Sequence, residues 1–191
     1  MPAPPLVLLD ANVLVQAPLR DTLLRLAEGP QLFRPLWSDR IFDEVRRTLQ
    51  NQFGIPPSRI ARLEDVVQQH FPESWITGYD ALIPQMTNDE KDRHVLAAAA
   101  HAAAPKLITY NLRHFPPDAT LPWHVTAIGP SAFLKALHQS HPAAVATVLH
   151  QQATDIRRTL PDQLRVLHKA IPAFVEYFRQ MSPTTGPPAA P

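Results

Sequence analysis

Three acidic residues of this 191-residue chain, Asp10, Glu44 and Asp92, occupy positions at which a carboxylate could do chemistry. Asp10 directly follows the apolar run Leu6–Leu9, which places it at the carboxyl end of a predicted buried strand. Open α/β sheets bind their ligands at this edge. An ordinary turn residue leaving a strand would give the same local pattern.

The second acid, Glu44, lies on a predicted helix whose apolar stripe is formed by Ile41, Phe42, Val45 and Leu49. On a helix with 3.6 residues per turn, Glu44 falls roughly 60° outside the arc of these side chains. It therefore lies at the border of the buried stripe and not on the solvent-facing side. A solvated glutamate is the alternative interpretation.

The third acid, Asp92, precedes Val95 and Leu96 by three and four positions, so on a helix it shares their buried face. An acid on a buried face is costly unless a positive charge lies nearby. A helix N-terminus typically offsets less than about 1 kcal/mol of that cost, and a metal ion would offset the rest. Asp89 and Glu90 lie in the first turn, where the helix dipole and capping account for them.

Three converging carboxylates suit a hard cation such as Mg²⁺ or Mn²⁺. Such an ion can orient a phosphodiester, lower the pKa of a bound water and stabilise the leaving oxygen. The sequence has no cysteine, which excludes a disulfide framework, a zinc ribbon and a thiol nucleophile. Its five glycines are scattered, so no phosphate-cradling loop suggests ATP or NAD.

The net charge of +1 gives no bulk indication of a nucleic-acid partner, so any such case must come from the site. The first apolar run ends after four residues, which is too short for a signal peptide or a membrane span. We therefore expect a soluble, cytoplasmic protein with no membrane partner.

The elements that must position the acids alternate between strand and helix as far as Pro130. The patterns predict strands at residues 6–9, 32–37, 106–109 and 123–127, and helices at residues 18–28, after Ser38, 57–70 and 87–104. Pro35 favours either an edge position or a short length for the second strand. Thr87 with Glu90 forms a capping box for the last helix. This alternation implies a parallel sheet with helices on both faces, an α/β/α sandwich.

From Ser131 to Met181 the pattern is helical only, with expected breaks at Pro142, Pro161 and Pro172. We therefore divide the chain into an α/β domain at residues 1–130 and a helical extension at residues 131–181. The tail at residues 182–191 is rich in proline and small residues, and we expect it to be disordered.

Four segments resemble, in order, the motifs of PIN domains. They are Leu8–Leu14, Trp37-Ser38 with Glu44 six residues later, Asp89–Ala99, and Leu107–Pro116. Each is weak alone, but four in order at such spacing are specific, and the likeness covers the α/β part of the chain. The resemblance implies a parallel α/β/α sandwich and metal-dependent cleavage of RNA. It also implies, in bacteria, frequent use as the VapC toxin of a toxin–antitoxin pair.

By this resemblance Asp10, Glu44 and Asp92 match the acidic metal ligands of the family. Asn111 stands at a fourth position that is often acidic, where it could coordinate through its carbonyl oxygen or orient water. The missing charge weakens the expectation of a tightly held second metal. Asn12 matches a polar residue of the first motif that can hold Asp10 or the water network.

Further candidates follow from the same likeness. Asp89 could compensate for the charge missing at the fourth acidic position, while Arg20, Arg93 and Arg113 could position phosphates and His114 could contact one. An exposed surface residue is the alternative at each of these positions. The family likeness favours a homodimer and a small antitoxin protein as partner, and the helices from residue 131 resemble an extension found on one subgroup of VapC-like proteins.

Two other functions share some of these features. A haloacid-dehalogenase-like phosphatase also begins with an apolar strand that ends in Asp, but it needs a second acid where this chain has Asn12. A PIN scaffold that binds RNA or protein without catalysis is suggested by Asn111. Within the nuclease interpretation, a toxin, a maturation nuclease and an orphan nuclease remain open.

Overall fold

The computed structural model describes residues 3–181, so the expected disorder of residues 182–191 falls outside the described part. The chain forms two compact units, which are joined in sequence between Pro130 and Ser131. The first unit contains the whole sheet, and the second is helical.

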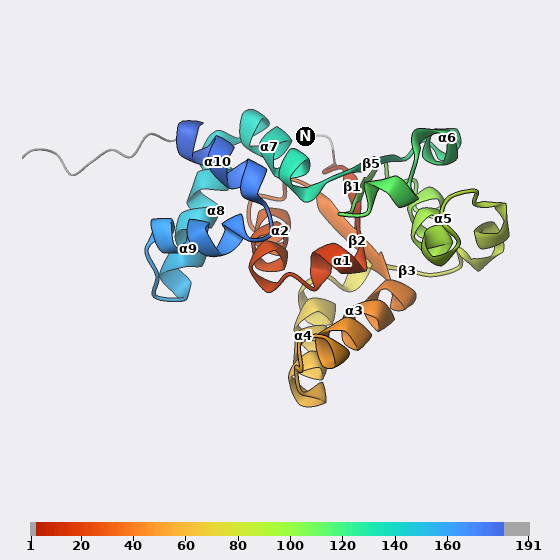
Figure 1. Ribbon diagram of the computed structural model, residues 1–191, viewed down its shortest axis with the longest axis horizontal. Coiled ribbons are helices and arrows are strands. Elements are labelled where there is room, and N and C mark those ends of the chain that lie inside the picture. Colours follow the sequence, from red (N-terminus) through yellow and green to blue (C-terminus); the bar gives the residue numbers. More distant parts are fainter. Residues whose placement is uncertain (1–2, 182–191) are drawn as a thin grey trace, which may run out of the picture. The chain divides into compact units, whose positions relative to one another are not determined.

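All five strands of the sheet are parallel, in the order β3-β2-β1-β4-β5 (Figure 1). The strands are β1 (Leu6–Leu9), β2 (Arg34–Ser38), β3 (Trp75–Ile76), β4 (Lys106–Ile108) and β5 (Thr126–Ile128). The prediction of a parallel α/β fold followed by helices is confirmed.

The direction of the chain across the sheet reverses between β1 and β4. From β1 it moves outward to β2 and β3, and then it returns to the other side of β1 to form β4 and β5. The pairing continues one residue past each strand, because Asp10 N donates to Ile108 O at 3.1 Å and Thr109 N donates to Ile128 O at 3.1 Å. Asp10 and Thr109 thus lie side by side where doubly wound sheets bind ligands.

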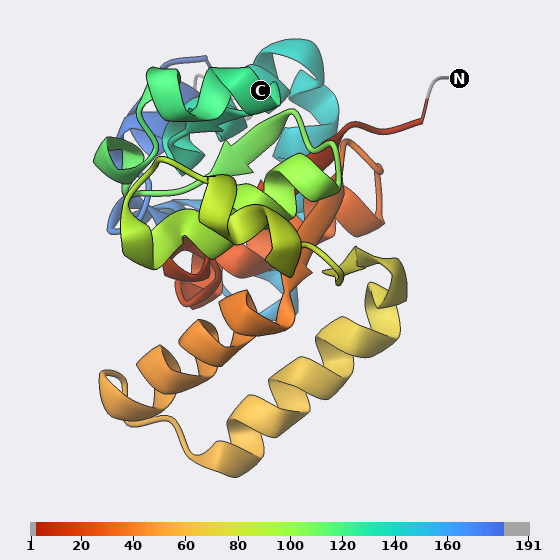
Figure 2. The same cartoon turned by 90° about the vertical axis from the view of Figure 1, so that its right-hand side faces the viewer.

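The helices of the first unit connect these strands. They are α1 (Ala11–Leu14), α2 (Ala17–Glu28), α3 (Asp39–Asn51), α4 (Pro57–His70), α5 (Arg93–His101) and α6 (Pro117–Thr120). Short 3₁₀ turns are η1 (Pro72–Ser74), η2 (Asp80–Gln85), η3 (Glu90–Asp92), η4 (Leu112–His114) and η5 (Leu121–Trp123). Helices α3 and α4 form a hairpin that extends away from the sheet (Figure 2). An ion pair between Arg46 and Glu64 links the two helices.

The core of the first unit is built around β1 and α5. Val7, Leu8 and Leu9 are fully buried, as expected for a strand covered on both faces. The α5 segment from Val95 to Ala99 is also fully buried and contacts both β1 and β4. Because three of these residues are alanines, α5 lies close to the sheet and brings its N-terminal end near the carboxyl ends of the strands.

The predicted helix at residues 87–104 is much shorter in the structure. Asp89, and not Thr87, caps the first turn by accepting a hydrogen bond from Lys91 N at 3.1 Å, and only a 3₁₀ turn follows. Asp92 has the dihedral angles φ −105° and ψ 6° and is the N-cap of α5. The expectation that Asp92 lies on a helix face was wrong. The side chain of Asp89 accepts a hydrogen bond from the nearby Lys91 N, and a bond of this kind competes with regular helix.

Of the two alternatives that Pro35 predicted for the second strand, the edge position is wrong, since β2 lies between β1 and β3. Arg34 N donates to Pro5 O, so the nitrogen of Pro35 points to the opposite side of the strand. On that side β3 pairs only with Trp37 and Ser38. The missing N–H of Pro35 therefore interrupts no ladder, and a proline is tolerated in an internal strand.

Two further differences concern short elements. The two-residue strand β3 was not predicted, because it is too short to show a period of two. The last strand begins at Thr126 and not at Trp123, because Leu121–Trp123 forms a 3₁₀ turn and His124 adopts a left-handed conformation with φ 57°.

The second unit contains α7 (Pro130–Ser140), α8 (Pro142–Asp155), α9 (Leu160–His168) and α10 (Pro172–Met181). The expected breaks at Pro142, Pro161 and Pro172 are present, and each proline stands in the first turn of the following helix, where its missing N–H leaves no bond unmade. Helix α9 packs against both α8 and α10.

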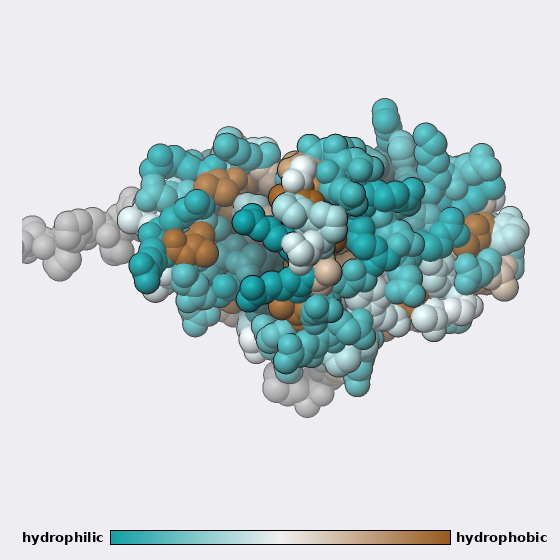
Figure 3. Space-filling model, turned by 90° about the horizontal axis from the view of Figure 1, so that it is seen from below, coloured by the Kyte–Doolittle hydropathy of each residue, from teal (hydrophilic) through white to brown (hydrophobic). Residues whose placement is uncertain are grey.

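The surface drawn in Figure 3 is largely hydrophilic, and hydrophobic side chains gather there only in small, separate patches. Within residues 3–181, no helix combines the length and the apolar character needed to cross a membrane.

We expect the first unit to fold without the second, because it is compact by itself and contains every strand of the sheet. A chain truncated after Pro130 should unfold in one cooperative transition and keep the circular dichroism of a mixed α/β protein. Thermal and urea unfolding of the truncated and full chains checks this. A truncated chain that lacks a cooperative transition would make residues 131–181 part of the core.

Candidate active site

Asp10 is the centre of a buried hydrogen-bond network between the ends of β1 and β4. Its side chain is 3% exposed, and its Oδ2 accepts hydrogen bonds from Thr109 Oγ1 at 2.7 Å and from Asn12 Nδ2 at 2.7 Å. The Oδ1 atom of Asn12 accepts from the backbone N–H of Tyr110 at 3.1 Å, and Thr109 Oγ1 accepts from that of Asn111 at 3.0 Å. The network fixes the Asp10 carboxyl group and the loop that follows β4 in one arrangement.

Glu44 reaches the same region from α3. It lies at the border of the buried stripe of this helix, with its side chain 33% exposed. Its Oε1 lies 2.9 Å from Nε2 of His94, a residue of α5 that is 2% exposed. This contact joins α3 to α5.

Asp92 reaches the region from the N-terminal end of α5. Its side chain is 15% exposed, and its Oδ2 lies 2.6 Å from Nδ1 of His114 on η4. Arg113 Nε in turn donates to His114 Nε2 at 3.1 Å. Asp92 is thus held at a helix N-terminus, where the dipole favours a negative charge.

These three acids line one pocket of about 370 Å³. Its walls come from α1, α3, the N-terminal end of α5 and the loop after β4, and the lining residues are Asp10, Ala11, Asn12, Val15, Gln16, Glu44, Thr48, Gln52, Phe53, Asp92, Tyr110 and Asn111. Among these described lining residues there are three carboxylates and no lysine, arginine or histidine. The pocket therefore concentrates negative charge that no cationic side chain of its wall balances.

The electrostatics of Asp10 reflect this concentration. Burial raises the pKa of Asp10 from 3.8 to about 6. The hydrogen bond from Thr109 opposes the rise, and the charges of Asp92 and Glu44 add to it. The three acids thus interact electrostatically.

The structure brings together five of the residues singled out from the sequence, since Asp10, Asn12, Glu44, Asp92 and Asn111 all line the pocket. Asp89 does not line it. Asp89 is exposed, and one of its carboxylate oxygens lies within 4.8 Å of ligand atoms of Asp92 and His114.

The four residues expected to contact phosphate are outside this pocket, as far as the described residues define it. Arg20 donates to the carbonyl oxygen of Leu14, and burial lowers its pKa from the ordinary value. Arg93 donates to the carbonyl oxygen of Asn88 at 3.4 Å. Arg113 and His114 are engaged in the chain of hydrogen bonds that ends at Asp92. Contact of these side chains with RNA stays a prediction.

Two residues of the site were not singled out from the sequence. Thr109 showed one usable signal, a hydroxyl at the carboxyl end of a strand adjacent to β1. His94 showed a weaker one, a single polar side chain in an otherwise apolar run two residues after Asp92. The partner of His94 lies 50 residues away, so the pairing could not be read from local spacing.

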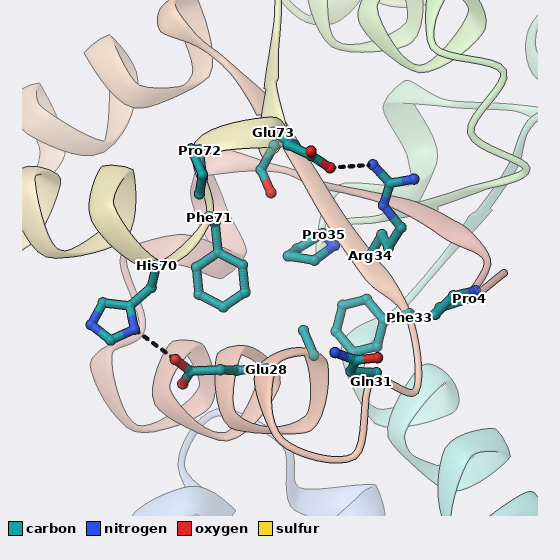
Figure 4. A pocket seen from close by; sticks show the side chains of 12 residues that line it. Pro4, Glu28, Gln31, Phe33, Arg34, Pro35, His70, Phe71, Pro72 and Glu73 are labelled. Atoms are coloured by element: carbon teal, nitrogen blue, oxygen red, sulfur yellow. Dashed lines mark hydrogen bonds and ion pairs between the residues drawn. The ribbon is translucent and has the colours of Figure 1, made fainter.

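A second pocket, of about 430 Å³, lies at the opposite end of the strands, near the amino ends of β2 and β3. Phe33, Pro35 and Phe71 face its interior (Figure 4). Its acids are paired, Glu28 with His70 at 2.6 Å and Glu73 with Arg34 at 3.1 Å. Although this pocket is the larger one, it lacks a set of unbalanced carboxylates, so the candidate active site is the pocket that contains Asp10.

The raised pKa of Asp10 predicts how the ion-free protein responds to pH. Because the pKa is about 6 in the folded state and 3.8 ordinarily, folding favours the protonated acid. The contribution of Asp10 to the free energy of unfolding should therefore be most favourable below about pH 4, and it should be lost as the pH rises through 6. The complete loss amounts to about 3 kcal/mol. Asp10→Asn should therefore unfold at higher urea concentration than the wild type at pH 7 with excess chelator.

The difference between Asp10→Asn and wild type should shrink as the pH falls below 6. It should approach zero below about pH 4, where Asp10 becomes protonated in the unfolded chain as well as in the folded one. Asp43→Asn is the control, since Asp43 is an exposed acid paired with Arg46 on the same helix as Glu44. A wild type as stable as Asp10→Asn at pH 7 would show that Asp10 bears no such cost.

Comparison with known proteins adds to this geometry. Residues 6–113 match the PIN domain family, and this segment contains the three acids, Asn12 and Asn111. Over 113 residues the chain is 36% identical to "Putative ribonuclease VapC50" of Mycobacterium tuberculosis, in an alignment that covers 58% of this chain and 67% of that protein. No protein of solved structure matches the chain. The sequence match and the parallel sheet with its cluster of acids agree, and the chain belongs to the PIN domain family.

Proposed function

We propose that this protein is a metal-dependent ribonuclease in which Asp10, Glu44 and Asp92 hold Mg²⁺ or Mn²⁺ and direct the hydrolysis of RNA phosphodiester bonds. The observation that carries the proposal is the convergence of these three carboxylates on one pocket. The name of the mycobacterial relative, which describes a ribonuclease, supports the same activity.

The donor chemistry of the pocket fits a hard divalent cation. Its charged groups are carboxylates, and Asn111 adds an amide whose carbonyl oxygen is also a hard donor. Burial raises the pKa of Asp10, and the charges of Asp92 and Glu44 add to the rise; a bound cation would relieve the repulsion between these acids. When bound, such an ion activates water and stabilises the leaving oxygen. Asn111 contributes no charge of its own, so the pocket supplies three negative charges and not four.

The remaining residues of the site fix the geometry of these acids. Thr109 and Asn12 hold Oδ2 of Asp10. The buried residues of β1 and α5 limit the movement of Asp10 and Asp92 relative to each other. A rigid arrangement of this kind lowers the cost of organising the site during the reaction.

Two exposed aromatic side chains in the pocket wall suit a single-stranded nucleic acid. Phe53 is 52% exposed and Tyr110 is 39% exposed. Exposed rings beside a phosphate-binding site can stack bases with little preference for sequence. Burial raises the pKa of Tyr110 to about 12, so its hydroxyl stays neutral at physiological pH and does not repel a phosphate.

We further propose that the protein acts in the cytoplasm as the toxin of a bacterial toxin–antitoxin pair, as a homodimer and with a small antitoxin protein as partner. Support comes from membership of the PIN domain family and from the VapC name of the relative. In this proposal residues 1–130 are the nuclease domain, and residues 131–181 are an extension with no part in the chemistry.

Loss of one acid should abolish the activity without unfolding the protein. Asp92→Asn and Glu44→Gln should each lower Mn²⁺-dependent cleavage of a mixed RNA pool by more than about 100-fold, since even outer partners of metal ligands typically contribute 10- to 100-fold. Expression of the wild type in bacteria should arrest growth, and expression of Asp92→Asn should not.

Asp43→Asn serves as the matched acid here too and should cleave RNA like the wild type. Wild-type cleavage that survives excess chelator would contradict the metal mechanism. A wild type that binds RNA without cleaving it would support a non-catalytic scaffold instead.

Removal of an aromatic ring should weaken substrate binding more than it slows the chemical step. Phe53→Ala should raise KM for single-stranded RNA by roughly 5- to 150-fold, the equivalent of about 1–3 kcal/mol of stacking, with little change in kcat. The control is Leu121→Ala, which removes a side chain that is 59% exposed and lies outside the pocket lining. Steady-state kinetics on a fluorescent oligoribonucleotide separates the two constants. Equal KM values in the two variants would exclude stacking on Phe53.

A further inference from the structure

Each of the three acids accepts a side-chain hydrogen bond, but the donors differ. Asp10 is held by a hydroxyl and an amide, whereas Glu44 and Asp92 are held by imidazoles. Neither His94 nor His114 lines the pocket. Both therefore act on the site only through the acid that they contact.

The proton of His94 can be assigned from its surroundings. Its Nε2 lies 2.9 Å from Glu44 Oε1, while its Nδ1 is buried and has no hydrogen-bond partner. A proton on Nδ1 would be a buried donor without an acceptor, which is costly. A lone pair there costs less, so the geometry favours a proton on Nε2, which donates to Glu44.

The proton of His114 is assigned in the opposite way. Its Nε2 accepts the hydrogen bond from Arg113 Nε at 3.1 Å, and so it carries no proton. The nitrogen that faces Asp92 is Nδ1, which donates to Asp92 Oδ2 at 2.6 Å. The two rings thus donate to their acids from different nitrogens.

We propose that His94 and His114 are positioning residues. Each ring fixes one oxygen of its acid, His94 that of Glu44 and His114 that of Asp92, and so orients the acid towards the cation. This inference rests on the proposed metal-dependent function and extends it to two residues outside the pocket. Hydrogen bonds of this type orient ligating carboxylates and are worth about 10- to 100-fold in metal affinity.

The partners of these two acids differ from the partner of an acid outside the pocket lining. On the same helix α3, Asp43 is paired with the guanidinium of Arg46 and does not line the pocket. An imidazole can orient a carboxylate oxygen because its N–H donor is part of a rigid ring.

The two contacts also fix the elements that carry the acids. Glu44 and His94 join α3 to α5, and Asp92 and His114 join the start of α5 to η4, the turn after β4. Loss of either contact should therefore broaden the positions available to one acid without opening the buried core.

The two histidines can be tested separately because they contact their acids through different ring nitrogens, Nε2 in His94 and Nδ1 in His114. Two amide side chains can each place a nitrogen at one of these positions. The side-chain nitrogen of glutamine lies four bonds from Cα, as Nε2 of histidine does, whereas that of asparagine lies three bonds away, as Nδ1 does. His94→Gln and His114→Asn should therefore keep the donor. His94→Asn and His114→Gln carry the same amides at the wrong reach, and leucine at either position removes the donor.

Isothermal titration of the full chain with Mn²⁺ measures affinity without any need for RNA. His94→Asn, His114→Gln and both leucine variants should bind Mn²⁺ about 10- to 100-fold more weakly than the wild type. His94→Gln and His114→Asn should stay close to the wild type. RNA cleavage should follow the same order through kcat, with KM for RNA little changed.

Two histidines outside the site provide matched controls. His70 forms an imidazole–carboxylate contact with Glu28 in the second pocket, and His138 is buried and contacts Tyr177. His70→Leu and His138→Leu should leave the Mn²⁺ affinity unchanged. If the leucine variants at positions 94 and 114 fail to fold, the comparison between the two amides at each position still decides the outcome.

Equal Mn²⁺ affinities for glutamine and asparagine at position 94 would overturn the proposal. So would equal weakening by His114→Asn and His114→Leu, which would instead make His114 a ligand together with Asp89 and Asp92. If the variants bind Mn²⁺ in the predicted order but the wild type does not cleave RNA, the positioning role stands and the proposed function is wrong. If the wild type cleaves RNA and no histidine variant changes the cleavage, the proposed function stands and the positioning role is wrong.

Discussion

The burial of the Asp10 carboxyl group at the carboxyl end of β1 is the constraint on which the site depends. Burial raises the pKa of this acid to about 6, so the ion-free protein bears a cost at neutral pH. Thr109 and Asn12 reduce the cost through short hydrogen bonds and do not remove it. A destabilising acid of this kind at a ligand-binding edge indicates function, because a sequence under no such demand would place a neutral residue there.

The position of that acid follows from the order of the strands. Because the chain reverses direction between β1 and β4, the ends of these two strands lie side by side with no connection crossing above them. The alanine-rich α5 packs closely on both strands and delivers Asp92 to the same place. Helix α3, which follows β2, brings Glu44 to the same pocket.

Two of the pockets in the first unit show how charge balance separates a candidate site from a cavity. Near the amino ends of the strands, Glu28 and Glu73 each contact a basic side chain, and the floor is apolar. Near the carboxyl ends, three acids share a pocket whose described lining holds no basic residue. Volume alone favours the first pocket, whereas chemistry favours the second.

The sequence by itself determined the sheet class, and it predicted the three acids and a domain division near Pro130, because burial periodicity and strand-end polarity are local properties. Only the tertiary structure decided how Asp92 is held, because Asp89 and Asp92 end the expected helix early and turn a helix-face residue into an N-cap. The tertiary structure also decided that β2 is an internal strand. Pro35 is tolerated there because β3 pairs only with Trp37 and Ser38, further along β2. The imidazole donors of Glu44 and Asp92 lie 50 and 22 residues away in sequence, and pairs at such separations are set by packing and not by local spacing.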